Sequence, residues 1–323
     1  MTSPITLSDV ERARERLAPW LEPTPLRTYP TLDQAVPGVH LHVKHENMQP
    51  TGSFKVRNGL STVTALGDAE RKRGIVGATT GNHGLGLAYA GRQLSVPVTI
   101  CVPLNNNPEK NSALRAWGAT VVEEGKDYDE AVAVASRLAA EREVTLAHST
   151  NNVNVLSGAG TMTLELVEQT QDLDVLLIAV GGGSQAVGAM TVARALKPAL
   201  QIIGIQAAGA STAHDAWHAR EPRQGSRADT FAEGVATRST YELTFPALLE
   251  GLADFVTVTD AEIAEGVRII LATTHHLVEG AGAMGVAAAI KLRDQLAGKS
   301  VGVVFCGANM DTGVLRRILN REL

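Results

Sequence analysis

The chain has 323 residues, of which 44% are hydrophobic and 20% charged, so it can build a substantial core and is not a disordered polymer. Its 29 basic and 34 acidic side chains give a net charge of −5, which argues against nucleic acid as a partner because no large basic surface is expected. At about 150 residues per domain, the length predicts two domains.

The sequence shows no sign of export or membrane insertion. Residues 1–17 lack an apolar stretch behind a basic start, and no apolar run reaches the roughly 18 residues that a transmembrane helix requires. The two cysteines, Cys101 and Cys306, are too few for a disulfide framework. We therefore expect a cytoplasmic protein without a membrane partner.

From about residue 40, short β-branched runs alternate with longer segments of helical spacing. Strands are predicted, in chain order, at 41–46, 74–79, 96–103, 119–125, 144–149, 174–183, 201–207, 255–259 and 300–308. Helices are predicted at 58–73, 82–94, 108–118, 128–143, 184–197 and 260–276. Strands separated by roughly 10–15 helical residues imply right-handed crossovers, so we predict an α/β fold of two open, mostly parallel sheets with flanking helices.

One stretch, residues 209–241, interrupts this alternation. It is polar, contains glycine and proline, and is too long for an ordinary connection. We expect it to cover or border a site.

A lysine stands out in the segment PTGSFKVRNG. Lys55 follows a turn of small residues and lies near the start of the first predicted helix. Burial near helix N-termini would lower its pKa and favour a free amine nucleophile. On spacing alone, a solvated surface lysine is the simpler interpretation.

Two glycine-rich turns follow predicted strands, where ligands of open parallel sheets bind. In the first, Thr79, Thr80, Gly81 and Asn82 join a strand to a helix. Their amides and hydroxyls would face an anion such as a carboxylate, or else Asn82 or Thr80 simply caps the helix.

The second turn, AVGGGSQAVG, contains consecutive glycines that allow several amides to point at one phosphate. Gly181, Gly183 and Ala186 also match the weak dinucleotide pattern G-x-G-x-x-A. That pattern needs an acidic residue about 20 positions on, where this chain has Gln206. We therefore favour a single phosphate group over a nicotinamide dinucleotide.

Two further groups of residues follow late in the chain. Cys306 ends the last strand, where it either packs as a small hydrophobic residue or meets a ligand. His276 and Glu279, beside His275, have the i, i+3 spacing that metal ligands can show, but no additional ligand lies close in sequence. We expect no metal there, and interpret the histidines as lying at the negative end of a helix.

Taken together, these segments resemble the fold-type II pyridoxal-phosphate enzymes, in particular the group of threonine dehydratases, serine dehydratases and serine racemases. The resemblance runs from EPTPLRTYPTLD at Glu22 to CGANMD at Cys306. PTGSFKVRNG looks like the family's Schiff-base lysine segment, and TTGNHG, GGGSQ and CGAN follow in the family's order.

The resemblance implies pyridoxal 5′-phosphate as the cofactor, bound through Lys55, which would also act as the catalytic base. Phe54 would flank the cofactor ring, Asn82 would hydrogen-bond its 3′-oxygen, Glu279 would lie beside it, and Cys306 would face the pyridine nitrogen. The phosphate would be held by Gly181, Gly182, Gly183, Ser184 and Gln185. The substrate carboxylate would be bound by Thr79, Thr80, Gly81 and His83.

The implied activity is that of an ammonia-lyase converting a β-hydroxy amino acid, such as threonine, serine or 3-hydroxyaspartate, to a 2-keto acid and ammonia. The alternatives are an amino-acid racemase with side elimination and, less favoured, a non-catalytic cofactor-binding protein. The resemblance also implies a homodimer, and a small domain at 49–148 inserted into a larger one made of 1–48 and 149–323.

Several positions depart from the family pattern. Ser184 replaces the fourth glycine of the phosphate loop, and Asn58 replaces the glycine that commonly follows the arginine of the lysine segment. Thr80 stands where racemases carry serine, which argues against racemisation. Gln206 and Thr212 occupy the positions of the acidic pair that binds a divalent cation in metal-activated members, so we expect no metal.

Overall fold

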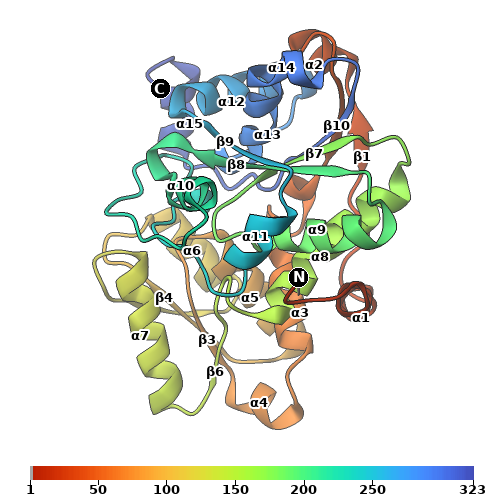
Figure 1. Cartoon of the computed structure of the whole chain (residues 1–323). Helices are drawn as coiled ribbons and strands as arrows, with labels where there is room; N and C mark the ends of the chain where they lie inside the picture. Colours follow the sequence, from red (N-terminus) through yellow and green to blue (C-terminus); the bar gives the residue numbers. More distant parts are fainter. Residues whose placement is uncertain (1–2) are drawn as a thin grey trace.

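Two β-sheets with flanking helices make up the protein (Figure 1). The structure is a computed structural model that describes residues 3–323. Nearly all neighbouring strands are parallel, which confirms the predicted α/β class with two mostly parallel sheets. Within the described part of the chain, no helix is both long and apolar enough to span a bilayer.

The larger sheet combines strands from both ends of the chain. Its order is β1 (Leu26–Thr28), β2 (His40–Lys44), β10 (Ser300–Val304), β7 (Val175–Ala179), β8 (Gln201–Ala207) and β9 (Asp254–Val258). Only β1 runs antiparallel to its neighbour in this sheet. Because β10 lies between β2 and β7, the last strand of the chain is central, and its carboxyl end opens toward the smaller sheet.

The smaller sheet is built from a continuous part of the sequence. Its order is β5 (Thr120–Glu123), β4 (Val98–Val102), β3 (Ile75–Ala78) and β6 (Thr145–Leu146), all parallel. Alternating side chains serve two apolar clusters: Ile75 and Ile100 pack on one face, Val76 and Cys101 on the other. This period of two is the pattern of a strand buried on both faces.

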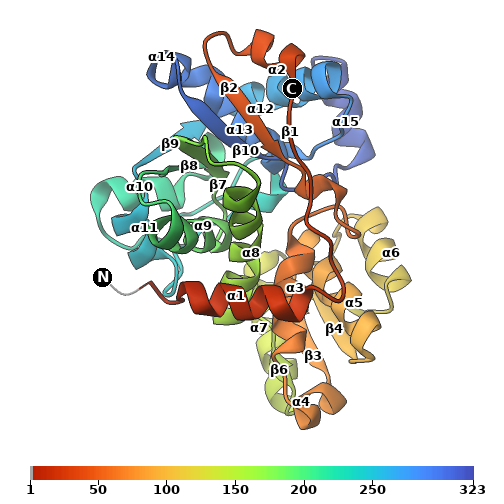
Figure 2. The same cartoon turned by 90° about the vertical axis from the view of Figure 1, so that its right-hand side faces the viewer.

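Helices cover both sheets. Around the smaller sheet lie α3 (Lys55–Thr64), α4 (Asp68–Arg73), α5 (Asn82–Leu94), α6 (Pro108–Ala116) and α7 (Tyr128–Glu141). On the larger sheet, α9 (Ser184–Leu196) and α13 (Gly280–Lys291) pack on opposite faces of β7 and β8, backed by α8 (Val153–Gln169) and α12 (Asp260–Thr274) (Figure 2). The remaining helices are α1 (Leu7–Leu17), α2 (Pro30–Ala35), α10 (Thr212–Ala219), α11 (Phe245–Gly251), α14 (Arg293–Leu296) and α15 (Thr312–Leu319). Three short 3₁₀ turns complete the list: η1 (Glu46–Met48), η2 (Ala208–Ala210) and η3 (Glu233–Val235).

Helices α3 and α5 cross at unusually close range because glycines occupy the crossing. A Cβ on Gly59 would collide with the carbonyl oxygen of Gly86, and a Cβ on Gly86 would collide with that of Lys55. The absence of side chains there brings the beginning of α3, with Lys55, against the beginning of α5.

The predicted limits of the helix at 58–73 are wrong. It begins three residues earlier, at Lys55, and the region contains two helices interrupted at residues 65–67. The second helix starts anew because the carboxylate of Glu70 accepts a hydrogen bond from the backbone N–H of Gly67, at 2.8 Å.

The structure also differs from the prediction in two buried helices and in the stretch at 209–241. Helices α8 and α13 were not predicted because they are rich in small residues and buried nearly all round, so they lack a polar face. The stretch at 209–241 contains helix α10, and irregular backbone is confined mainly to its second half. The domain limits at residues 48/49 and 148/149 stay a prediction.

Candidate active site

A cavity of about 470 Å³ lies where the carboxyl ends of the strands of both sheets meet. Its walls include every residue to which the sequence analysis assigned a role, from Phe54 to Cys306. Parallel strands present their carboxyl ends at one edge, so segments distant in sequence converge there. The placement is observed, whereas the individual roles stay predictions.

Lys55 is the first residue of α3 and lies half-buried in the cavity wall. Its ammonium group is 5.0 Å from the centre of the Phe54 ring. Burial lowers the pKa of Lys55 to about 8, although the nearby Cys306 and Glu279 side chains oppose this change. About a tenth of this lysine is therefore a free amine at pH 7 and about half at pH 8, far more than for an ordinary lysine, which suits a nucleophile or a base.

The glycine loop that follows β7 has the shape of a phosphate cradle. Gly183 has a φ of 93°, a left-handed conformation that favours glycine, and it immediately precedes α9. A Cβ on Gly182 would collide with the side chain of Thr150, and a Cβ on Gly181 would lie 2.9 Å from the Gly234 carbonyl oxygen. Side chains are thus excluded from this wall of the cavity.

The same loop supplies hydrogen-bond donors. Ser184 and Gln185 begin α9, so their backbone N–H groups have no partner within the helix and carry the positive end of its dipole. Donors of this kind, in a loop without bulky side chains, match the requirements of a phosphate group. The residues present therefore fit the 5′-phosphate of pyridoxal phosphate.

The turn between β3 and α5 forms another wall. Thr79 accepts a hydrogen bond from the backbone N–H of Gly81 at 2.9 Å, which leaves the Thr80 hydroxyl in the cavity lining. The Nε2 atom of His83 donates to the carbonyl oxygen of Ala147 at 3.0 Å. Burial and the nearby Lys55 lower the pKa of His83 to about 3, so the ring is neutral and its Nδ1 is an acceptor.

A chain of three side chains crosses the cavity floor. Asn82 donates to the carboxylate of Glu279 at 2.7 Å and accepts from the amide of Asn309, also at 2.7 Å. Burial raises the pKa of Glu279, and the hydrogen bond from Asn82 offsets part of this increase. The ring of His276 packs against that of His45.

Cys306 lies just beyond β10 and is a buried free thiol. Its carbonyl oxygen accepts a hydrogen bond from the backbone N–H of Phe54 at 3.0 Å, which ties the lysine segment to the central strand. Burial raises the pKa of the Cys306 thiol, and the Glu279 carboxylate raises it further. The thiol is therefore neutral and inert as an acid over the physiological range.

Several lining residues escaped the sequence analysis. Thr150 touches the glycine loop, and the hydroxyl of Thr237 has no hydrogen-bond partner among residues 3–323. Tyr241 also lines the cavity, and Lys110 forms an ion pair with Glu233 across it. Three of these five residues lie in the stretch at 209–241, whose length and polarity indicated that it borders a site. No feature of the sequence pointed to Thr150 or Lys110 as lining residues.

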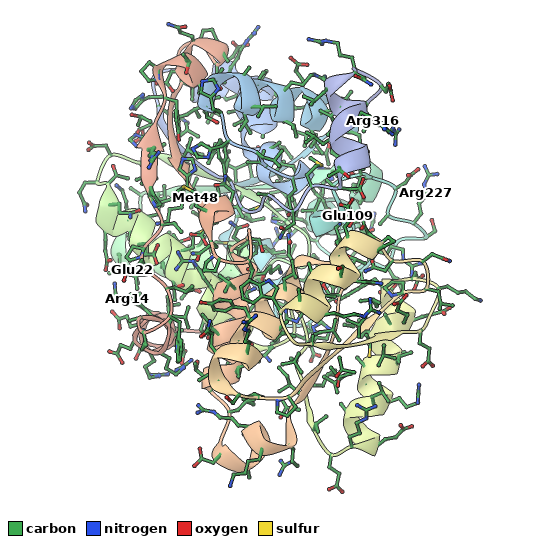
Figure 3. All side chains as sticks on the ribbon, turned by 180° about the vertical axis from the view of Figure 1, so that it is seen from behind. Arg14, Glu22, Met48, Glu109, Arg227 and Arg316 are labelled. Atoms are coloured by element: carbon green, nitrogen blue, oxygen red, sulfur yellow. The ribbon has the colours of Figure 1, made fainter. Side chains whose placement is uncertain are left out.

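Polar contacts connect the start of α6 with the start of α15 beside the cavity. The amide of Asn107 donates to the carboxylate of Asp311, and the Thr312 hydroxyl donates to Glu109 at 3.0 Å. Seen from behind, Glu109 on α6 lies below α15, the helix that carries Arg316 (Figure 3).

Comparisons with known proteins agree with this geometry. A family model described as "Pyridoxal-phosphate dependent enzyme" matches residues 17–307. The chain is 33% identical to an L-threonine ammonia-lyase of Thermotoga maritima over 99% of this chain and 79% of that protein. It is 35% identical to an L-threo-3-hydroxyaspartate ammonia-lyase of a Pseudomonas species, over 94% and 95% respectively. Maize serine racemase has a similar structure, with a TM-score of 0.92 and 26% identity over 98% of this chain and 97% of that one.

Proposed function

Since the chain belongs to the family of pyridoxal-phosphate-dependent enzymes, we propose that it is an ammonia-lyase for a β-hydroxy amino acid. The observation that carries this proposal is the meeting of a buried amine, Lys55, with the glycine loop at Gly181–Gly183 in one cavity. The names of the relatives, which include a threonine and a 3-hydroxyaspartate ammonia-lyase, support the reaction class.

The residues of this chain divide the work of binding. Lys55 would hold the cofactor covalently, the amides from Gly181 to Gln185 would hold its phosphate, and Phe54, Asn82, Glu279 and Cys306 would surround its ring. When bound, pyridoxal phosphate supplies an electron sink for the electrons of the substrate α-carbon. Buried, neutral surroundings around that ring would limit how long the negative charge persists.

The substrate is held by the turn before α5. Thr79, Thr80 and Gly81 would bind the α-carboxylate through hydroxyl and amide groups, with His83 supporting the turn. The amino group of the substrate would displace Lys55 from the cofactor, and the freed ε-amine, with a pKa of about 8, would then remove the proton from the α-carbon. The β-hydroxyl group would leave as water together with the proton taken from the α-carbon, and hydrolysis of the resulting imino acid would consume one water molecule and release ammonia and a 2-keto acid.

A screen of amino acids for released keto acid and ammonia tests this proposal. We expect turnover with at least one of serine, threonine and 3-hydroxyaspartate, and a loss of at least about a hundredfold in Lys55→Ala. After borohydride reduction, mass spectrometry should find the cofactor attached to the peptide that contains Lys55. Attachment to another lysine would contradict the assignment.

A racemase is the second candidate, supported by the structural similarity to maize serine racemase. The hydroxyl group of Thr80 lines the same cavity as Lys55 and would have to deliver a proton to the opposite face of the α-carbon. Measuring the inverted amino acid beside the keto acid in the same screen distinguishes the two activities.

We also propose that the enzyme is a cytoplasmic homodimer. In each subunit, a large domain of residues 1–48 and 149–323 and a small domain of residues 49–148 would enclose the cavity. The resemblance of the lysine and glycine segments to the family supports the dimer and the domain limits. Light scattering on the purified protein tests the dimer; a monomeric mass would refute it.

A further inference from the structure

A buried group of four charged side chains lies behind the cavity rather than in its lining. Lys44, Glu46, Arg57 and Glu165, here called the Arg57 cluster, are 0%, 0%, 1% and 7% exposed. They come from β2, η1, α3 and α8, and none of them is among the cavity-lining residues. Two positive and two negative charges give the cluster no net charge.

Every N–H donor of Arg57 is used in this cluster. Its Nε and Nη2 donate to the two oxygens of Glu46, each at 2.8 Å. Nη1 and Nη2 donate to the two oxygens of Glu165 at 2.6 and 2.8 Å, and Nη1 also reaches the Thr161 hydroxyl at 3.2 Å. The planar fork of arginine matches two carboxylates at once, and a lysine has too few donors and the wrong shape to do so.

The two carboxylates are held in turn by other elements. Glu46 accepts from the Thr24 hydroxyl at 2.6 Å, and Glu165 accepts from Lys44 at 2.8 Å. The ε-ammonium of Lys44 has further contacts with the Thr24 carbonyl and with Gln169. Lys44 lies on β2 and Glu165 on α8. Through these residues Arg57 is connected to the larger sheet, although α3 packs on the smaller one.

Arg57 follows Lys55 by two residues, in the first turn of α3. On the other side, Phe54 donates to the carbonyl of Cys306, and Ser53 pairs with Gly307. The backbone is thus anchored on both sides of Lys55, through Ser53 and Phe54 before it and through Arg57 after it. Freeing the second anchor would allow the first turn of α3 to shift or fray.

We propose that Arg57 is a positioning residue that holds the ε-amine of Lys55 in the cavity by anchoring the start of α3 to Glu46 and Glu165. The proposal rests on the proposed function in one respect, namely that Lys55 carries the cofactor. Arg57 itself touches neither the cavity nor any residue assigned to the substrate.

The protonation of Lys55 reports its position. The groups that face its amine are Cys306 beyond β10, Glu279 before α13 and His83 on α5. Burial lowers the pKa of Lys55 to about 8 in the native geometry. An amine that moves toward water loses this effect, so its pKa rises toward the ordinary value of 10.5.

The test compares Arg57→Lys with Lys44→Met in the full-length protein freed of its cofactor. Both variants damage the same buried cluster, but Lys44 lies on β2 and is bonded to Glu165, Gln169 and Thr24 rather than to α3. Pyridoxal phosphate is added between pH 6 and 11, borohydride traps the adduct, and mass spectrometry quantifies the Lys55 peptide. Thermal unfolding is measured beside it.

We expect Lys44→Met to lower the melting temperature while its trapping profile keeps the wild-type midpoint. Arg57→Lys should move that midpoint upward by at least about one pH unit, because the less buried amine is protonated at higher pH. An unchanged midpoint in Arg57→Lys, with a melting temperature lowered as in Lys44→Met, would overturn the proposal and leave Arg57 a stabilising residue only. Absence of a Lys55 adduct in the wild type would instead refute the proposed function.

A milder pair covers the case in which Arg57→Lys does not fold. Thr161→Val removes one of the five Arg57 contacts without changing charge, whereas Thr163→Val on the same helix removes a hydroxyl without a partner in the described structure. We expect an upward shift of the trapping midpoint in Thr161→Val alone. Identical profiles in the two variants would count against the positioning role.

Discussion

Three titratable residues in the cavity are all driven toward their neutral forms. Burial lowers the pKa of Lys55 and raises the pKa of both Glu279 and Cys306. In each case the charged form loses its hydration, and the neighbouring groups compensate only in part. The cavity therefore offers a reactive amine in weakly charged surroundings. A bound phosphate group would contribute much of the charge in the occupied cavity.

The lowered pKa of Lys55 has a consequence for the stability of the cofactor-free protein. The unfolded chain binds this proton up to about pH 10.5 and the folded chain only up to about pH 8, so wild-type stability rises with pH between these values. Relative to Lys55→Met, the free energy of unfolding should increase by about 3 kcal/mol over that interval. Urea unfolding at several pH values measures it, and a constant difference would show that Lys55 is not desolvated.

Substitution of Cys306 tests whether its thiol faces the pyridine nitrogen, as the family resemblance implies. Cys306→Ser keeps a neutral hydrogen-bonding group, so release of keto acid should largely survive. In Cys306→Asp, a carboxylate would favour a protonated ring nitrogen and prolong negative charge at the α-carbon, which should shift products toward inverted amino acid. Burial beside Glu279 would raise the pKa of the new carboxyl and weaken the effect. Unchanged product ratios in both variants would show that Cys306 only packs in the core.

Among the elements, the loop between β7 and α9 shows the clearest division between fold and function. The hydroxyl of Thr244 donates to the carbonyl of Gly182 at 2.6 Å, so the loop is held from outside the cavity. Its inner side must remain free of side chains because Thr150 packs directly against Gly182. The conformation of the loop is thus supported by the fold, and its lack of side chains leaves the backbone amides accessible from the cavity.

Gly182→Val should therefore weaken cofactor binding by about tenfold or more, since displacing the loop by steric contact readily costs 1.4 kcal/mol of binding free energy. The melting temperature of the cofactor-free protein should fall much less in proportion. Gly67→Ala is a suitable control, because only the Glu70 carboxylate, at 3.4 Å, would contact the added methyl group. Equal losses of affinity and stability in Gly182→Val would mean that the loop is structural.

At the scale of the whole molecule, ion pairs connect the stretch at 209–241 to the start of α7 beside the cavity. Arg238, in the irregular part of residues 209–241, donates to the carboxylates of Asp127 and Asp129 at the start of α7. All three side chains are partly exposed, so each pair contributes little by itself and is weakened by salt. Asp127, Tyr128 and Tyr241 line the cavity, so these ion pairs lie at its edge.

We expect Arg238→Ala to raise KM by up to about fivefold, with little change in melting temperature, because exposed pairs are worth about 1 kcal/mol or less. The KM of the wild type should rise with salt toward that of the variant. Arg137→Ala serves as the control, since Arg137 pairs with Glu124 and Glu141 on the outer side of α7. Equal effects of both substitutions would exclude a specific role for Arg238.

The sequence by itself determined the fold class, the order of most elements and a set of residues that all line the cavity, although it missed other lining residues such as Thr150 and Lys110. Periodicity revealed most of the strands and six helices, and the carboxyl ends of parallel strands necessarily meet at one edge. The same reasoning missed α8 and α13, whose buried surfaces have no polar face, and the interruption between α3 and α4.

Only the tertiary structure decided the contacts between segments far apart in the chain. Arg57 bonds Glu165 across 108 residues, and Arg238 reaches Asp127 across 111. No local pattern encodes such pairs, because they depend on how two sheets and their connecting helices pack together. For the same reason, the sequence singled out Lys55 only as a candidate, and the fold was needed to show that burial lowers its pKa and that Arg57 donates to Glu46.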